Sequence, residues 1–331
     1  MSEEQYVDDD FSLIILSKVD PEKPLPAEVF LKVDGKYILF RNKGDSISSE
    51  KFDLFMSKGI KNIYVKNDDI MDFLDWIADS SEEEVDQLVQ ESDEASRGFF
   101  ERTVQTKEKV YEVYFEEEIN DEIVDSLQQN VADFIEDISK NPITAQAIAA
   151  LAQRNNTVAE HSVNVANLAV YLGMVAGHSH QFVLENLYMG SIFHDYGKAK
   201  IPAHILENTN NNMYSHAIQE HPIEGAKILR KTNGIPEQVM QIITQHHEQF
   251  NGHGFPKGLS GDQIYDLAQI VSIANVFDNT LYENRNLSKA EKYKKAIKVI
   301  QYDNGKNWNP KFIPRIIEAL TLAFTEKKLA S

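Results

Sequence analysis

The order of apolar and polar positions along the chain predicts a front part that contains strands. Asp34 and Gly35 separate two alternating runs and suit a type I′ hairpin turn. Residues 46–60 are typical of a helix that begins at a serine cap and stops at Gly59. The short apolar runs predict β-strands at residues 11–16, 27–33, 36–41 and 61–65. Together these elements predict a small α/β domain.

Beyond residue 68 the apolar spacing changes to the three-and-four repeat of helices. Residues 68–115 are strongly charged, and their acidic stretch at 80–94 is interpreted as a solvated helix face or a connector. Further helices are predicted at residues 121–138, 158–177, 181–194, 224–231, 236–248, 266–282 and 313–324. The predicted fold class is α+β, with a small α/β domain and its helical connector at residues 1–115 and an all-α bundle at residues 116–331.

Charge is distributed unevenly over this division. The chain of 331 residues has a net charge of -19; residues 1–140 hold 36 acidic against 15 basic side chains, and residues 141–331 hold 16 against 18. An acidic surface repels polyanions, so we do not expect duplex nucleic acid as a partner. A protein partner of the acidic domain stays open, and the nearly neutral C-terminal part does not oppose a small phosphorylated ligand.

Composition narrows the location and the chemistry. No apolar run approaches the ~20 residues of a membrane helix, and the acidic start of the chain is unlike a secretory signal. We therefore expect no membrane insertion and a cytoplasmic location. Cysteine is absent, which excludes a thiolate nucleophile and thiolate metal ligands. Any metal must be held by nitrogen and oxygen atoms.

Candidate chemistry lies in the histidines of the helical part. Helical spacing and the ends of the apolar segments predict that five of them face inward: His161, His194, His221, His246 and His247. Asp195 follows the second of these at the inward end of its helix, which Gly197 is expected to stop. Each buried imidazole needs a polar partner, and a buried carboxylate needs a cation. A metal centre meets both needs at once.

The donor types indicate which metals such a centre binds. Imidazole and carboxylate without thiolate suit iron, manganese, zinc or cobalt. His246 and His247 differ by about 100° around a helix, so we expect each to serve one of two neighbouring ions. The sequence therefore predicts a binuclear centre.

Several segments of the helical part together resemble a known set of motifs. "HDYGKAKIP" is similar to HDIGKxxIP, "HPIEGAKIL" to HxxxGxxIL, "HHEQFNGHGFPKGLSGDQI" to HHExxDGxGYPxGLxGxxI, and "IVSIANVFDNTL" to VAxADxFDAL. They occur in the same order and spacing over residues 158–278. The motifs are those of the HD-GYP family of bacterial cyclic di-GMP phosphodiesterases. In "FLKVDGKYILF" and "GIKNIYV" the front domain also resembles the small domain that precedes some of these enzymes.

The resemblance implies a helical HD-type bundle that hydrolyses cyclic di-GMP, or a related phosphorylated nucleotide, with two divalent metal ions. Iron is the first choice and manganese or zinc the alternatives. The positions that match metal ligands are His161, His194, Asp195, His221, His246, His247 and Asn275, with Asp278 as the alternative to Asn275. Catalytic roles fall to Lys198 and Asp195, and substrate binding to Lys198, Phe255, Arg285 and Lys289.

The chain departs from the family's pattern at several of these positions. Phe255 replaces a tyrosine, so an aromatic face is retained without its hydroxyl group. Asn275 is a neutral donor where the family has a ligand aspartate. Thr157 stands where members with three ions carry a glutamate, which favours two ions. In "ENRNLSK", Arg285 and Lys289 are out of register with the family's phosphate-binding DRPYK.

Three functions are compatible with these matches and departures. The first is an active, metal-dependent cyclic di-GMP phosphodiesterase. The second is a degenerate relative that acts as a sensor or protein-interaction module, which the changes at Phe255 and Asn275 favour. The third is an HD phosphohydrolase that acts on another phosphorylated substrate.

Overall fold

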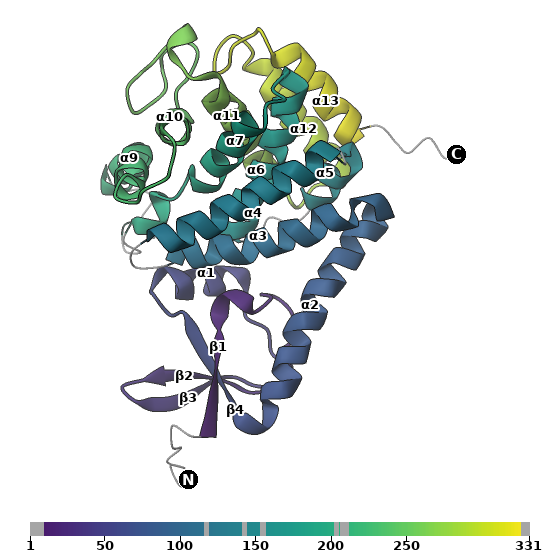
Figure 1. Ribbon diagram of the computed structural model, residues 1–331, viewed down its shortest axis with the longest axis vertical. Helices are drawn as coiled ribbons and strands as arrows, with labels where there is room; N and C mark the ends of the chain where they lie inside the picture. The colour runs from purple at the N-terminus through teal and green to yellow at the C-terminus, as the bar shows by residue number, and fades with distance from the viewer. Residues whose placement is uncertain are drawn as a thin grey trace. The chain divides into compact units, whose positions relative to one another are not determined.

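The computed structural model describes residues 10–115, 119–140, 144–152, 157–201, 205 and 212–325. The chain forms two compact units (Figure 1). The N-terminal unit comprises residues 1–87 and 115–117, and the helical unit comprises residues 88–114 and 118–331. The functional domains predicted as residues 1–115 and 116–331 stay a prediction.

The N-terminal unit contains an antiparallel four-stranded sheet in the order β1-β4-β2-β3. Its strands are β1 (Phe11–Ile15), β2 (Val29–Val33), β3 (Lys36–Arg41) and β4 (Asn62–Lys66). Asp34 and Gly35 have φ values of 49° and 77°, which is the left-handed geometry of the predicted hairpin turn. Between β3 and β4 lies α1 (Ser49–Ser57), where the Ser48 side chain accepts a hydrogen bond from the Lys51 amide. The predicted strands, turn and helix are confirmed.

The rest of the described chain is helical, as the apolar spacing predicted. Residues 68–115 form α2 (Ile70–Glu91) and α3 (Arg97–Phe115). The later helices are α4 (Asp121–Lys140), α5 (Ala145–Leu151), α6 (Val158–Ala176), α7 (Gln181–Phe193), α9 (Asn212–Leu229), α10 (Glu237–Gln245), α11 (Asp266–Glu283), α12 (Lys289–Tyr302) and α13 (Ile313–Thr325). The α+β fold class is confirmed. The sequence interpretation missed α5 and α12, the latter because it buries only four of its side chains and its surface is rich in lysine.

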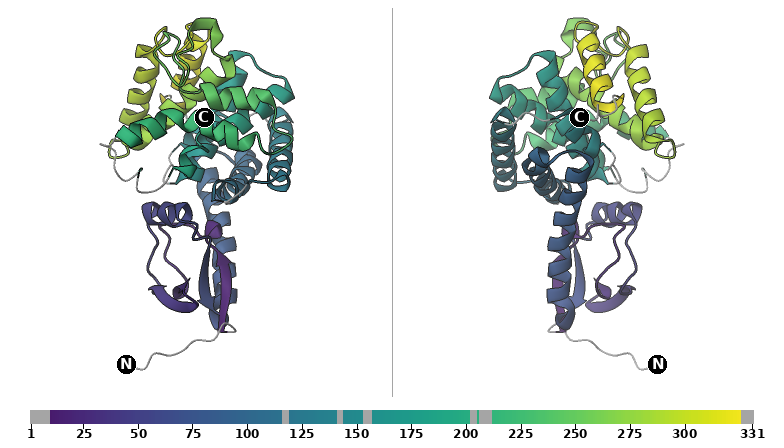
Figure 2. Two further views of the ribbon diagram at one scale, coloured as in Figure 1. Left: turned by 90° about the vertical axis from the view of Figure 1, so that its left-hand side faces the viewer. Right: turned by 90° about the vertical axis from the view of Figure 1, so that its right-hand side faces the viewer.

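Helices α6, α7 and α11 form the centre of the helical unit (Figure 1), where α6 packs against both of the others and α10 packs against α7. Two further views show the helices of the teal to yellow part of the chain and the loops that join them (Figure 2). The start of α6 is held by a capping box, in which Thr157 and Glu160 satisfy each other's backbone amides. Gly177 ends this helix with a φ of 105°. Among the helices of the described residues, none is both long enough and apolar enough to cross a membrane.

Candidate metal centre

The histidines predicted to face inward meet where four helices of the helical unit come together. His161 lies in the first turns of α6, and His221 lies within α9. His194 and Asp195 follow the last residue of α7 directly. His246 and His247 occupy the same position after α10. The sequence therefore supplies donors from helix ends and helix interiors to one point.

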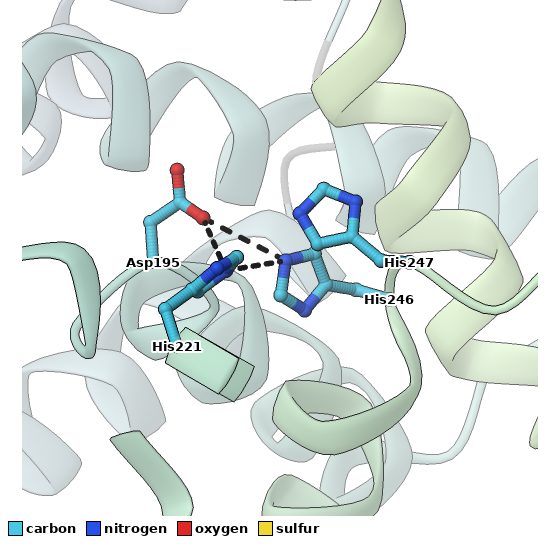
Figure 3. A group of neighbouring side chains, drawn as sticks. All are labelled: Asp195, His221, His246 and His247. Carbon is cyan, nitrogen blue, oxygen red and sulfur yellow. Dashed lines mark hydrogen bonds and ion pairs between the residues drawn. The ribbon is translucent and has the colours of Figure 1, made fainter. Parts of the chain in front are cut away.

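These residues form two groups of potential metal ligands that share Asp195. One group is Asp195, His221, His246 and His247, and the other is His161, His194 and Asp195; within each group the donor atoms lie within 4.8 Å of one another. Oδ1 of Asp195 lies 3.2 Å from Nε2 of His221 and 3.6 Å from Nε2 of His246 (Figure 3). Its other oxygen, Oδ2, lies 3.5 Å from Nε2 of His194 and 4.0 Å from Nε2 of His161. The carboxylate thus faces a different group with each oxygen.

Three of the imidazoles are oriented by their own chain segment. Each lies against the backbone carbonyl three residues earlier, through its Nδ1 atom: His194 to Ser191 at 2.6 Å, His221 to Ile218 at 2.6 Å and His246 to Ile243 at 2.7 Å. A carbonyl oxygen only accepts hydrogen bonds, so Nδ1 must be the donor. In the neutral ring Nε2 then carries the lone pair and faces the cluster, which is the form that binds metal.

His161 and His247 are held differently. Nδ1 of His161 lies 2.7 Å from Oδ2 of Asp278, a nearly fully buried carboxylate of α11, and this leaves Nε2 facing Asp195. The ring of His247 is stacked on that of Phe255, with centroids 4.5 Å apart and an interplanar angle of 23°. In both cases a side chain from another segment orients the imidazole.

The polar atoms of the cluster fit a divalent cation. Nε2 of His194, Nε2 of His247 and Oδ1 of Asp195 are buried and have no hydrogen-bond partner within the described residues. Nε2 of His221 and Nε2 of His246 lie only 3.4 Å apart, although both carry lone pairs in the tautomers described above. Such an arrangement is costly without a shared cation. The donor set of imidazole and carboxylate is compatible with binding of a divalent metal.

The surroundings hold these groups in their metal-binding protonation states. Burial lowers the pKa of His194 and of His247 well below the ordinary value, and neighbouring histidines lower both pKa values further. Burial alone would raise the pKa of Asp195, but the neighbouring His194, Lys198, His221 and His246 together bring it well below its usual range. Neutral imidazoles and an ionised carboxylate need to release no proton when a metal binds.

Two of the predicted substrate-binding residues lie beside the cluster. Lys198, at the start of a short 3₁₀ segment (Lys198–Lys200), places Nζ 2.8 Å from Oδ2 of Asp195 while its side chain keeps 31% of its surface exposed. Phe255 packs on His247 as described above. The predicted pair Arg285 and Lys289 is exposed, and the Arg285 guanidinium lies 4.5 Å from the centroid of the Tyr282 ring. Their predicted role in substrate binding stays a prediction.

The two alternatives for the last ligand differ in their contacts. Asn275 is buried in α11, and its Oδ1 accepts a hydrogen bond of 2.6 Å from Nδ2 of Asn279. Asp278, one turn further along the same helix, contacts His161. Of the two, Asp278 has the observed contact with the cluster, as a carboxylate that orients a histidine.

Three details of the sequence interpretation were wrong. His246 and His247 lie in one group, because α10 ends at Gln245 and the helical separation of about 100° does not apply beyond it. The helix predicted at residues 224–231 begins earlier, at Asn212, so that His221 lies inside α9 and not before it. Gly197 has an ordinary φ of -62°, so it is not a left-handed helix stop; a Cβ atom there would lie 2.0 Å from the His221 carbonyl oxygen. Glycine is needed at this position for close approach of α9.

Two further residues near the cluster had no role in the sequence interpretation. The buried carboxylate of Glu248 accepts hydrogen bonds from the amides of Lys257 at 2.8 Å and of Leu259 at 2.9 Å, which fastens the loop that carries Phe255. Lys292 of α12 is half-buried; burial and Lys289 lower its pKa, while Asp278 raises it. Glu248 follows the two histidines directly, and Lys292 lies one turn after Lys289. Their positions relative to these motif residues could therefore have identified both of them in the sequence.

Comparison with known proteins identifies the family of the chain. The profile of the HD domain family matches residues 145–311, which is just over half of the chain. The chain therefore belongs to the HD domain family. The resemblance drawn from the motifs is confirmed.

Individual relatives cover different shares of the chain. A cyclic di-GMP phosphodiesterase of Pseudomonas aeruginosa is 26% identical over 200 residues, which are 59% of this chain and 47% of that protein. A 3′3′-cGAMP-specific phosphodiesterase of Vibrio cholerae is 32% identical over 120 residues, or 36% of this chain and 27% of that protein. The chain thus spans less than half the length of these relatives.

One solved structure resembles the whole fold. Bd1817, an HDG"Y"P protein from Bdellovibrio bacteriovorus, superimposes with a TM-score of 0.64 at 24% identity, covering 94% of this chain and 100% of that one. At this level of identity the likeness concerns the fold.

Proposed function

We propose that this protein is a metal-dependent phosphodiesterase that hydrolyses a cyclic dinucleotide, with cyclic di-GMP as the first candidate substrate. The observation that carries the proposal is the pair of ligand groups joined by Asp195, in which buried donor atoms face one another without a partner among the described residues. Relatives named for cleavage of cyclic di-GMP and of 3′3′-cGAMP support the substrate class.

The centre is proposed to hold two divalent transition-metal ions, one for each ligand group. The seven proposed protein ligands are His161, His194, Asp195, His221, His246, His247 and Asn275, with Asp278 as the alternative to Asn275. Iron is the first candidate and manganese or zinc the alternatives, because nitrogen and oxygen donors suit each of them. When bound, such ions supply Lewis acidity that stabilises the charge of a phosphodiester transition state.

Lys198 is the proposed catalytic side chain that the protein itself brings to the phosphate. Its ammonium group lies 2.8 Å from Asp195 and keeps 31% of its side-chain surface exposed, so it can contact a phosphate oxygen while still bonded to the carboxylate. A fixed positive charge at a phosphate oxygen stabilises the negative charge that develops there. Asp195 has two proposed roles: it holds this lysine and it joins the two ligand groups.

Phe255 is proposed to receive a base of the nucleotide. Its ring is half-buried and is stacked on His247, and the Glu248 carboxylate fastens its loop through two backbone amides. An aromatic ring held in this way offers a stacking surface beside the metal site. Arg285 and Lys289 are proposed to contact the phosphates from the solvent side, where both are exposed.

The acidic N-terminal domain, residues 1–115, is proposed to regulate the enzyme or to bind a partner protein. The excess of acidic side chains in residues 1–140 supports an interaction governed by charge. A partner with a basic surface would meet this domain without competing for the anionic nucleotide.

The test is turnover at known metal content. Protein loaded anaerobically with Fe(II) or Mn(II) is assayed with cyclic di-GMP, 3′3′-cGAMP and cyclic di-AMP, and metal is counted on the same samples. We expect about two ions per chain and hydrolysis of at least one of these dinucleotides. Full metal loading with nucleotide binding but no hydrolysis would support the sensor function instead. Absence of metal after reconstitution would contradict the proposal.

A further inference from the structure

Tyr114 is a fully buried residue in the last turn of α3, outside all the motifs that resemble the family. Its phenol donates a hydrogen bond of 2.6 Å to the backbone carbonyl of Ile192 in α7. The same oxygen accepts a hydrogen bond of 3.1 Å from the hydroxyl group of Ser162 in α6. One phenol therefore joins two helices that carry proposed metal ligands.

Each contact of Tyr114 falls beside one of those ligands. Ser162 follows His161 directly, and Ile192 precedes His194 by two residues. The Tyr114 ring also packs edge-on against that of Tyr196, with centroids 5.4 Å apart, and Tyr196 follows Asp195 directly. Two of the proposed ligands are thus adjacent in sequence to a residue that Tyr114 touches, and a third lies two residues from one.

The hydrogen bond to Ile192 falls on a carbonyl that its own helix does not satisfy. Helix α7 ends at Phe193, and the last four carbonyls of a helix lack an intrahelical partner. In a buried site such a carbonyl needs a donor from elsewhere, and Tyr114 supplies it. The segment that turns from α7 into His194 and Asp195 is therefore held by a side chain of α3.

The main chain at Tyr114 is also anchored near the cluster. Nζ of Lys200 donates a hydrogen bond of 3.3 Å to the Tyr114 carbonyl, and this lysine lies two residues after Lys198. The end of α3 is consequently tied both to α7 and to the segment that follows it. Movement of this helix end would therefore shift the positions of several proposed ligands together.

We propose that Tyr114 is a positioning residue of the metal centre, which sets the relative placement of His161, His194 and Asp195 through its bonds to Ser162 and Ile192. This inference rests on the proposed metal site but needs no particular substrate. Outer contacts of metal ligands contribute about 10- to 100-fold to metal affinity. We expect the contribution of Tyr114 to metal affinity to fall in this range, although Tyr114 touches none of the proposed ligands directly.

The test compares Tyr114→Phe with Tyr293→Phe. Tyr293 is buried in α12, and its phenol donates a hydrogen bond of 3.2 Å to the Ala149 carbonyl, so the control loses the same kind of bond elsewhere in the helical unit. Co(II) affinity is measured by competition with a chelator, the visible Co(II) spectrum reports ligand geometry, and the thermal midpoint of the metal-free protein reports stability.

We expect Tyr114→Phe to weaken Co(II) binding about 10-fold and to alter the spectrum. Tyr293→Phe should lower the thermal midpoint to a similar extent with wild-type affinity and spectrum. Ser162→Ala removes only one of the two hydrogen bonds of the Tyr114 phenol, so it should weaken Co(II) binding by less. If Tyr114→Phe does not fold, Ser162→Ala takes its place in the test. If Tyr114→Phe, or Ser162→Ala in its place, binds Co(II) with the same affinity and the same spectrum as the wild type, the inference about Tyr114 is wrong and the proposed function is untouched. If the unmutated protein itself does not bind Co(II), the proposed function is contradicted as well.

Discussion

The histidines of the cluster fall into two sets that differ in what orients their rings. In the first set a carbonyl of the same segment accepts the Nδ1 hydrogen bond: His194, His221 and His246. In the second set a side chain from another segment fixes the ring, with Asp278 bonded to His161 and Phe255 stacked on His247. The same chemical role is therefore supported by local geometry in one set and by tertiary contacts in the other.

The difference shows where the site can be altered by mutation. A backbone carbonyl is present whatever the side chain, so no simple substitution removes the support of the first set. The second set depends on Asp278 and Phe255, which can each be changed singly. Variation in metal affinity or substrate choice is thus expected to arise mainly at His161 and His247.

The largest effect is expected from Asp195→Asn, which tests whether the two sets act as one centre. Asp195 belongs to both groups of potential ligands, and its negative charge would lower the free-energy cost of placing cations in this buried site. We expect metal affinity to fall by more than about 100-fold, beyond the range for residues outside the ligand shell. Elemental analysis after dialysis measures this, with Asp266→Asn at an exposed position of α11 as the control. Loss of one ion with the other retained would show two separable sites.

Asp278→Asn tests the tertiary support of His161. The amide still accepts the Nδ1 hydrogen bond but carries no charge, so His161 becomes a poorer ligand. We expect metal affinity to fall about 10- to 100-fold, measured by chelator competition. Asn275→Asp, one turn away in the same helix, is the matched variant and should change affinity less. If Asn275→Asp has the greater effect, Asn275 is the ligand and Asp278 is not needed for metal binding.

Phe255 tests the support of His247 and the proposed stacking surface together. Phe255→Ala should weaken binding of cyclic di-GMP by about 1 to 3 kcal/mol, whereas Phe255→Tyr should stay within about 1 kcal/mol because the aromatic face is retained. Calorimetry at equal metal loading gives both values. If Phe255→Tyr instead raises kcat with unchanged affinity, the missing hydroxyl group acts in the transition state. Equal affinity of the wild type and Phe255→Ala would rule out stacking.

The smallest effect is expected from Glu248→Gln. This substitution weakens the attachment of the loop that carries Phe255 but leaves the Phe255 ring itself unchanged. The amide side chain can accept from only one of the two backbone amides, so the other loses its partner. We expect faster hydrogen exchange at Lys257 and Leu259, a nucleotide affinity lower by less than about 10-fold, and unchanged metal content. Exchange measured by NMR or mass spectrometry gives the first result. Protection equal to the wild type would show that the loop is held by its other contacts.

Much of the fold was predictable because its signals are short-range. Alternation of apolar residues and the Asp34-Gly35 turn indicated the strands, apolar spacing with a serine cap indicated α1, and apolar spacing alone indicated α6 and α11. The helices that were missed, α5 and α12, are short or mostly polar, so their apolar pattern is weak. Residue types and motif order were likewise sufficient to predict a histidine and aspartate cluster with nitrogen and oxygen donors.

The sequence by itself determined the identity of these donors, the membership of the HD domain family and the local carbonyl that orients each histidine of the first set. Only the tertiary structure decided that His246 and His247 lie in one group, that Gly197 is needed for close approach of α9, and that Asp278 orients His161 across 117 positions of the chain. It also brought Tyr114 to the helices that carry the ligands. The physical reason is range: hydrogen bonds and spacing within a helix depend on neighbours in sequence, whereas these contacts exist only once separate helices have packed.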